Sequence, residues 1–353
     1  MEMQITEKEY LDFMLNDVVK SEVCRKMHIK ALKFEGQHFF KYQKYECKYF
    51  KPNVTGSIHF SSPDTFNDIS ESKIELDVNE KMFQLLYALF KLFKEGLISK
   101  SDYEHLCKKI RESTLETPLA AAFFITNYKQ DIFIKYMQLL DEAHTAYKEI
   151  ISFFNSDNPY LVTCFSKRSN SDIMWAYYGD KHFGYCVEYN FDKIFIDLIC
   201  RHECNEAYLS GALKFNLSIV DSLHEVTYTD KPIIVNAEKL IKNYIENKEL
   251  LFSSQYIKSL RRKKQYQALK RKKTDWSKEK EVRFIIDPEN TSLELDKDYN
   301  IIIPSDLISC VYAGQRSVSR VKKYAEAFRV KSLKCKISNI DSSGNINVDG
   351  FPF

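Results

Sequence analysis

Glycine is scarce in this chain, with nine among 353 residues. Loops that cradle phosphates with backbone amides are built largely from glycine, and the sequence contains neither a Walker loop nor the glycine fingerprint of dinucleotide-binding folds. The helix motif of metalloproteases is also missing. The sequence therefore predicts few phosphate sites built from glycine.

Long apolar runs and a strong excess of one charge are lacking as well. No window approaches about 18 consecutive apolar residues, the first residues are acidic without an apolar signal region, and the formal charge is only +3. The nine cysteines are an odd number scattered along the chain, which is not the pattern of a disulfide framework. We expect a protein of the reducing cytoplasm without a membrane partner.

Aromatic residues are abundant, at 14% of a chain that is 44% hydrophobic. This composition predicts a large aromatic core in about two domains, or in one large domain with insertions. Strand patterns lie dispersed among helical ones, which favours an α+β fold with a mixed or antiparallel sheet. The predicted organisation is an N-terminal helix at 1–34, an α+β domain at 35–330 with a helical insertion at about 79–155, and a C-terminal β extension at 331–353. The insertion fits a cap over the site and ordinary helical packing equally well.

The segment 276–286, with the sequence WSKEKEVRFII, carries the strongest candidate site. Side chains of a strand alternate between two faces, so Glu279, Glu281 and Arg283 are expected on one face, about 7 Å apart, with apolar residues on the other. Two carboxylates and a guanidinium on a rigid strand can carry out chemistry. The alternative is a solvated strand face on which Arg283 neutralises the glutamates.

Three further patterns are weaker. The basic cluster Lys258–Lys273 fits a solvated helix face or a phosphate-facing patch for nucleic acid or a dinucleotide. Cys200, His202 and Cys204 lack the second ligand pair that structural zinc needs, so no metal is assigned. Cys164 fits a buried apolar role better than that of a nucleophile.

Taken together, these motifs resemble the bacterial DUF2971 family, a domain of unknown function, over roughly residues 35–330. The motifs that carry the resemblance are Lys41-Tyr42, Ile58–Pro63 with Phe66-Asn67-Asp68, Cys164–Ser166, Met174–Tyr178, Gly184–Val187, Val226–Tyr228, Trp276–Arg283 and Val311–Gly314. The sequence departs from the family pattern in Ile69, where a proline is usual, and in the long helical insertion.

The order of three motifs is also similar to that of ADP-ribosyltransferases. These enzymes have a first strand with Arg, or with His followed by Tyr, a second strand ending in Ser or Thr, and a later strand with a catalytic Glu, often as Glu-x-Glu. Lys41-Tyr42, Phe165-Ser166 and Glu279-Lys280-Glu281 occupy the corresponding order, with lysine in place of Arg or His. The resemblance implies an ADP-ribosyltransferase-like fold and NAD as a substrate.

Under this hypothesis Glu281 stabilises the oxocarbenium-like ribose, and Glu279 orients the acceptor or takes its proton. The expected NAD-binding residues are Lys41, Tyr42, Asn67, Asp68, Ser166, Trp175, Tyr178 and Arg283. Among them, Asn67 and Asp68 fit a turn better than ligand positioning, and Trp175 fits buried packing at least as well as stacking on a ligand. The expected acceptor is nucleic acid or protein bound through the basic cluster. The expected role is that of a bacterial toxin or anti-phage effector with a neutralising partner. The alternatives are a metal-dependent phosphodiesterase or nuclease and a non-enzymatic nucleotide or nucleic-acid binding module.

Overall fold

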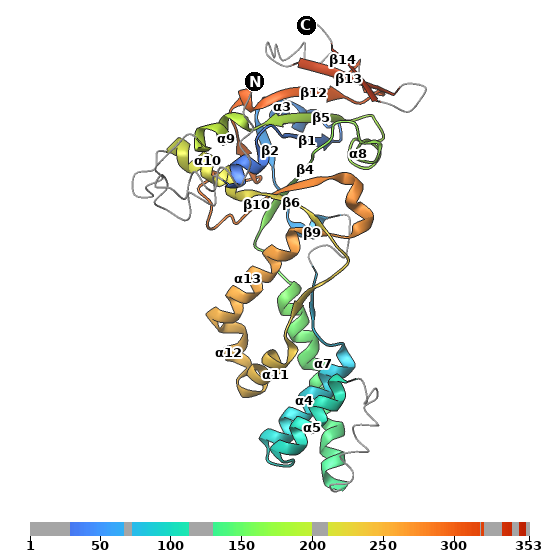
Figure 1. Ribbon diagram of the computed structural model, residues 1–353, viewed down its shortest axis with the longest axis vertical. Helices are drawn as coiled ribbons and strands as arrows, with labels where there is room; N and C mark the ends of the chain where they lie inside the picture. The colour runs from blue at the N-terminus through green and yellow to red at the C-terminus, as the bar shows by residue number, and fades with distance from the viewer. Residues whose placement is uncertain are drawn as a thin grey trace. The chain divides into compact units, whose positions relative to one another are not determined.

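The computed structural model describes residues 29–66, 73–112, 130–199, 211–317, 319–320, 334–340 and 346–350 (Figure 1). The chain divides into two compact units. The sheet unit comprises Met1–Phe66, Pro159–Thr229 and Lys272–Phe353, and the helical unit comprises Asn67–Asn158 and Asp230–Arg271. Because the chain enters the helical unit twice, the predicted insertion at 79–155 accounts for only its first segment.

An eight-stranded sheet forms the centre of the sheet unit, in the order β14-β13-β12-β5-β1-β4-β10-β6. Its strands are β1 (His38–Gln43), β4 (Leu161–Ser166), β5 (Tyr185–Asn190), β6 (Leu223–Glu225), β10 (Glu281–Ile286), β12 (Ile308–Ala313), β13 (Lys334–Ile340) and β14 (Ile346–Gly350). The pairs are antiparallel except β12 with β13, which is parallel. The expected α+β class with a mixed sheet is confirmed at this level.

The two faces of this sheet differ in chemistry. Residues opposite one another on neighbouring strands share a face, and the register Glu281 to Ser166, Ser166 to Phe40 and Phe40 to Glu188 defines one face across four strands. We call it the glutamate face. The other face carries the main apolar core of the sheet unit, with Phe39, Phe165, Val187, Val282 and Phe284 among its buried residues. A smaller cluster around Trp175 covers part of the glutamate face.

Smaller elements complete the sheet unit. They are α3 (Cys47–Thr55), β2 (Ser57–His59), η1 (Pro63–Thr65), α8 (Asp172–Tyr177), α9 (Asp192–Ile199), α10 (Gly211–Ser222), β7 (Thr227–Tyr228), η3 (Thr274–Glu279), β11 (Asn300–Ile302) and η4 (Ser305–Leu307). The segment after β2 contains η1, where the Ser62 side chain accepts a hydrogen bond from the Asp64 amide. The strand β9 (Arg271–Lys272) pairs with β7 and leads the chain into η3.

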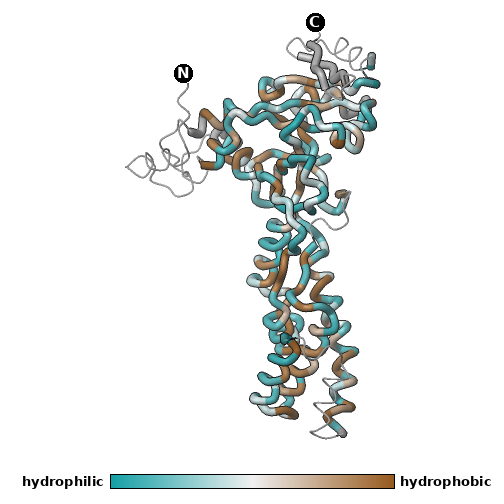
Figure 2. The backbone as a smooth tube through the Cα atoms, turned by 45° about the vertical axis from the view of Figure 1, so that its right-hand side comes forward, coloured by the Kyte–Doolittle hydropathy of each residue, from teal (hydrophilic) through white to brown (hydrophobic). Residues whose placement is uncertain are grey.

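Amphipathic helices build the helical unit, and Figure 2 shows hydrophilic and hydrophobic residues alternating along them. They are α4 (Glu80–Lys94), α5 (Lys100–Arg111), α7 (Gln130–Asn155), α11 (Ala237–Glu246), α12 (Lys248–Ser253) and α13 (Gln255–Leu269), with a small parallel sheet of β3 (Ile74–Leu76) and β8 (Ile233–Val235). Their apolar faces share one core, with Phe83, Tyr136 and Phe154 fully buried. The side chains of Asn79, Ser99 and Asn236 cap the N-termini of α4, α5 and α11. Each accepts a hydrogen bond from a first-turn backbone amide that has no partner within the helix.

Several sequence predictions lie outside the described residues. They include most of the N-terminal helix expected at 1–34, of which 29–34 are helical, and parts of the helical insertion and of the C-terminal β extension. In the helical unit, α11 and α12 are separate helices, since Asn247 between them is extended. The expected C-terminal β extension contains the antiparallel pair of β13 and β14.

Candidate functional site

The charged segment is not one continuous strand, which corrects the prediction from alternation. Residues 274–279 form the 3₁₀ helix η3, and Lys280 has a left-handed backbone with φ of 49°, so β10 begins only at Glu281. Glu281 and Arg283 share the glutamate face, as expected for alternate strand residues. Glu279 reaches the same place by another route, from the end of η3.

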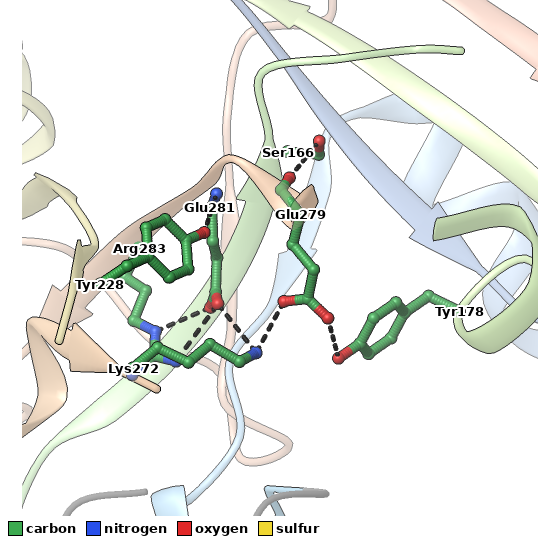
Figure 3. A network of polar contacts seen from close by, with 7 residues as sticks. All are labelled: Ser166, Tyr178, Tyr228, Lys272, Glu279, Glu281 and Arg283. Carbon is green, nitrogen blue, oxygen red and sulfur yellow. Dashed lines mark hydrogen bonds and ion pairs between the residues drawn. The ribbon is translucent and has the colours of Figure 1, made fainter. Parts of the chain in front are cut away.

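Lys272 joins the two glutamates (Figure 3). Its Nζ lies 2.7 Å from Glu279 Oε2 and 3.1 Å from Glu281 Oε2. Arg283 holds the other side of Glu281, with Nε donating to Oε1 at 2.7 Å and a terminal nitrogen donating to Oε2 at 3.3 Å. Tyr178 donates from its hydroxyl to Glu279 Oε1 at 3.1 Å. Two carboxylates and two cations thus form one connected network.

All four charged groups of this network are buried. The exposed fractions are 1% for Arg283, 2% for Glu279, 5% for Glu281 and 7% for Lys272. A buried charge is tolerated only when it is paired and hydrogen bonded, and here each carboxylate has a cation at direct contact. The solvated strand face considered from sequence is therefore wrong, and neutralisation of Glu281 by Arg283 takes place inside the fold.

The same surroundings move the pKa values of the two carboxyls in opposite directions. Burial alone would raise the pKa of Glu281, but Arg283 and Lys272 outweigh it and lower that pKa to about 2. For Glu279 burial dominates, and its pKa is raised although Lys272 opposes the shift. A pair of carboxyls with separated pKa values can divide a proton-transfer task, the ionised one stabilising positive charge and the other exchanging a proton.

Acidification is expected to destabilise the sheet unit through Glu281. Its pKa is lower when folded, about 2 against an ordinary 4.5, so its stabilisation is complete above pH 4.5 and is lost as the pH falls toward 2. The difference corresponds to about 3 kcal/mol. The shift of Glu279 has the opposite sign. Urea unfolding of wild type and Glu281→Gln between pH 5 and pH 2 measures the effect, and parallel curves for the two proteins would contradict it.

Neighbouring strands fix the backbone around the network. Ser166 donates from its hydroxyl to the Glu279 carbonyl at 2.7 Å and accepts from the Arg168 amide at 3.1 Å. The Glu281 amide donates to the Tyr228 hydroxyl at 2.8 Å. Ser166 thus positions the glutamate segment by donating to the backbone carbonyl of Glu279.

Lys41 lies on the opposite face of the sheet from Glu281. It is next to Phe40, which shares the glutamate face, so strand alternation turns it to the other side. There its Nζ contacts Thr163 Oγ1 and lies 5.8 Å from the centre of the Phe165 ring. Burial lowers the pKa of Lys41 to about 8. The geometry therefore separates Lys41 from the glutamates, contrary to the expected joint site.

Tyr42 and Trp175 share the glutamate face but are packed into the small cluster there. The Tyr42 hydroxyl donates to the Arg168 carbonyl at 2.7 Å, and its ring meets the Trp175 ring edge-on at 5.0 Å. Trp175 is fully buried, stacks on His182 and donates from its indole nitrogen to the Ser169 carbonyl. These contacts favour the packing role of Trp175 over stacking on a ligand.

Two predicted binding residues, Asn67 and Asp68, lie outside the described residues. Phe66, which precedes them, has its ring centre 5.0 Å from the Arg283 guanidinium carbon. The residue that precedes the predicted pair, Phe66, therefore contacts the network through Arg283. Cys164 lies opposite Arg283 on β4, and burial followed by the Glu281 carboxylate raises the pKa of its thiol well above the ordinary value. This raised pKa disfavours the thiolate that a nucleophile requires.

The basic cluster Lys258–Lys273 does not act as one surface. Arg261 donates to the Ser156 and Asp157 carbonyls, and Lys264 donates to the Ile234 carbonyl at 2.7 Å, so these two cations tie elements of the helical unit together. Lys258 and Lys263 are exposed. Lys272, at the end of the cluster, belongs to the buried network.

Lys272 and Tyr228 are the residues of the network that sequence reasoning did not assign. Lys272 follows Arg271 and precedes Lys273, so nothing in composition distinguished it from solvated neighbours. The one available signal for a buried Lys272 was strand alternation. A two-residue strand directs Arg271 and Lys272 to opposite sides, so only one of them can face the network. Tyr228 belonged to a predicted strand, but its pairing could not be read from the sequence.

In the part of the chain that the structure describes, no group of three or more His, Cys, Asp or Glu side chains is arranged to hold a metal ion. The residues Cys200–Cys204 lie outside that part. None of the described helices combines the length and apolar character needed to cross a membrane.

Comparison with known proteins gives one match. No curated protein and no solved structure matches the chain. A family model described as "Protein of unknown function (DUF2971)" matches residues 174–284. The matched stretch begins in α8, ends in β10 and includes Tyr178, Lys272, Glu279, Glu281 and Arg283. Over the stretch that holds most of its charged network, the chain is therefore similar to the DUF2971 family, whose description assigns no activity.

Proposed function

We propose that the protein is an NAD-dependent ADP-ribosyltransferase whose reacting groups are Glu281 and Glu279. The observation that carries the proposal is the opposite displacement of the two carboxyl pKa values within one network. Cleavage of the bond between nicotinamide and ribose creates positive charge on the sugar, which an ionised carboxylate stabilises. Glu281 is the carboxylate held ionised, and Glu279 is the one able to exchange a proton.

The order of the strands supports the same proposal. The motifs Lys41-Tyr42 and Phe165-Ser166 are carried by β1 and β4, and the motif Glu279–Glu281 runs from the end of η3 into β10. The strands β1, β4 and β10 are neighbours in the sheet. Ser166 on the middle strand is bonded to the backbone of Glu279. These are spatial relations that the chain order alone did not require.

The proposed reaction balances as follows. Nicotinamide leaves with the electron pair of its bond to the ribose C1′ atom, and Glu281 stabilises the resulting oxocarbenium-like sugar. The acceptor attacks C1′ with its own lone pair, and its proton passes to Glu279. Since Glu281 is 5% exposed and paired on both oxygens, the ribose must displace part of the contact from Lys272 or Arg283. The displaced cation is then available to the NAD pyrophosphate.

The charge of the network also bears on the phosphodiesterase alternative. Lys272 and Arg283 already balance the two carboxylates, so the network presents no excess negative charge to a divalent cation.

The proposed transferase would suit a cytoplasmic effector of growth arrest or phage defence, because unrestrained transfer consumes NAD. Such an effector requires a neutralising partner.

Nicotinamide release from NAD by the purified full chain tests the proposal. We expect NAD to bind and nicotinamide to be released at the same rate with and without a chelator. Loss of turnover with the chelator would favour the metal-dependent alternative, and absence of NAD binding at millimolar concentration would overturn the transferase proposal. A binding module would bind NAD without release.

A further inference from the structure

An exposed aromatic pair lies beside the charged network. Tyr177 of α8 is 63% exposed, and its ring meets the ring of Trp276 in η3 edge-on at 6.2 Å. Trp276 is partly exposed. A tyrosine with this exposure gains little from packing, so the pair offers aromatic surface to a ligand.

Lys272 links this pair to the glutamates. Its Nζ lies 5.0 Å from the centre of the Trp276 ring and 2.7 Å from Glu279 Oε2. Trp276 and Glu279 are also three residues apart on η3, and Tyr178, the neighbour of Tyr177, donates to Glu279. A planar group stacked on the pair therefore lies next to the segment that carries the buried Glu279.

Exposed cations surround the same short helix. Lys273 precedes η3, Lys278 lies in its last turn, and Lys280 follows it, and all three are exposed. Lysines spaced along an aromatic surface are the combination that follows a phosphate backbone while bases stack.

We propose that this surface, Tyr177 and Trp276 with Lys273, Lys278 and Lys280, binds single-stranded nucleic acid and presents one of its bases as the acceptor of ADP-ribose. The binding surface is independent of catalysis, whereas the acceptor role depends on the transferase function proposed above. A base within a duplex has both of its faces covered by stacking, so the surface requires an unpaired base.

The transfer step balances with a base nitrogen as nucleophile. The nitrogen lone pair forms the bond to C1′ as nicotinamide leaves with the electrons of its own bond. The proton of that nitrogen passes to the Glu279 carboxylate and then to water. The products are an ADP-ribosylated base, nicotinamide and one proton.

Fluorescence anisotropy with a fluorescein-labelled single strand of about 20 nucleotides tests binding by the full chain. We expect Trp276→Ala and Tyr177→Ala each to weaken binding roughly tenfold, in line with the loss of one stacked base. Lys278→Glu should reduce the salt dependence of binding. Tyr256→Ala is the matched control, since Tyr256 is 55% exposed and lies beside Lys239 but belongs to the helical unit. Tyr177→Ala removes a mostly exposed side chain, so it remains informative if Trp276→Ala does not fold.

Transfer is followed in the same preparations with labelled NAD and nicotinamide release. Label on the single strand, reduced by Trp276→Ala and retained by Tyr256→Ala, supports the proposal. Binding that depends on Trp276 without NAD consumption supports the surface and overturns its acceptor role together with the transferase function. NAD consumption with binding equal in all variants overturns the surface and leaves the transferase function standing. Label on protein alone, or equal labelling of a duplex, overturns the nucleic-acid acceptor.

Discussion

Glu281→Gln is expected to lower the rate of nicotinamide release roughly 100- to 1,000-fold, as the loss of one preorganised electrostatic contact does in other active sites. The substitution keeps the shape of the side chain and removes its negative charge. The wild-type carboxylate has a pKa near 2, so it is ionised throughout the range in which the enzyme would work. An amide cannot stabilise the positive charge of the ribose in this way.

Glu188→Gln provides the matched control for this loss. Glu188 is a buried glutamate on the same face of the same sheet, connected to Glu281 through the pairs with Phe40 and Ser166. It contacts His38 and accepts from Tyr312 at 2.7 Å. At about 4.8 Å per strand, three strand spacings separate the two glutamates. Glu188→Gln should therefore retain nicotinamide release.

Two measurements make the comparison decisive. NAD affinity by calorimetry separates a loss of binding from a loss of turnover, and we expect Glu281→Gln to bind NAD without releasing nicotinamide. Unfolding by urea shows whether each variant is folded under the assay conditions. Equal turnover in Glu281→Gln and Glu188→Gln would remove Glu281 from the reaction and leave the network a structural role only.

The sequence predicted which segments form the strands of the site better than it predicted which charged side chains these strands bring together. Alternation placed Glu281 and Arg283 on one face correctly, because the strand from Glu281 is regular. The same rule failed for Glu279, since the left-handed backbone at Lys280 ends the strand and no residue type in that position announces it. Glu279 is joined to Glu281 through Lys272, which contacts both carboxylates and is a tertiary partner of both.

Lys41 shows a second limit, that of inferring a site from the order of motifs along the chain. Adjacent residues on a strand point to opposite faces, so Lys41 and Tyr42 could not both face the glutamates. Which of them does so depends on the register of β1 with its neighbours, and this register is set by pairing with distant segments. The aromatic composition predicted a large core correctly but did not indicate which aromatic residues remain exposed, such as Tyr177.

Arg283→Met is expected to destabilise the sheet unit by about 3 to 5 kcal/mol, the usual result of removing one partner from a buried ion pair. Arg283 is 1% exposed and donates twice to Glu281. Methionine fills a similar volume, so the loss reports the uncompensated carboxylate rather than a cavity. Both tryptophans of the chain, Trp175 and Trp276, belong to the sheet unit, so tryptophan fluorescence during urea unfolding follows this unit selectively.

The cause of that destabilisation is separable from the mere loss of an arginine. In Arg283→Met with Glu281→Leu no unpaired charge remains at this position, and apolar replacement of a whole buried pair is often neutral, so the double variant should recover a large part of the lost stability. Lys193→Met removes an exposed pair whose atoms are also 2.7 Å apart, with side-chain exposures of 71% and 56%, and should have a much smaller effect. If the double variant is instead as unstable as the sum of its single changes, the two side chains act independently, and the pairing cannot be the reason that Glu281 stays ionised inside the fold.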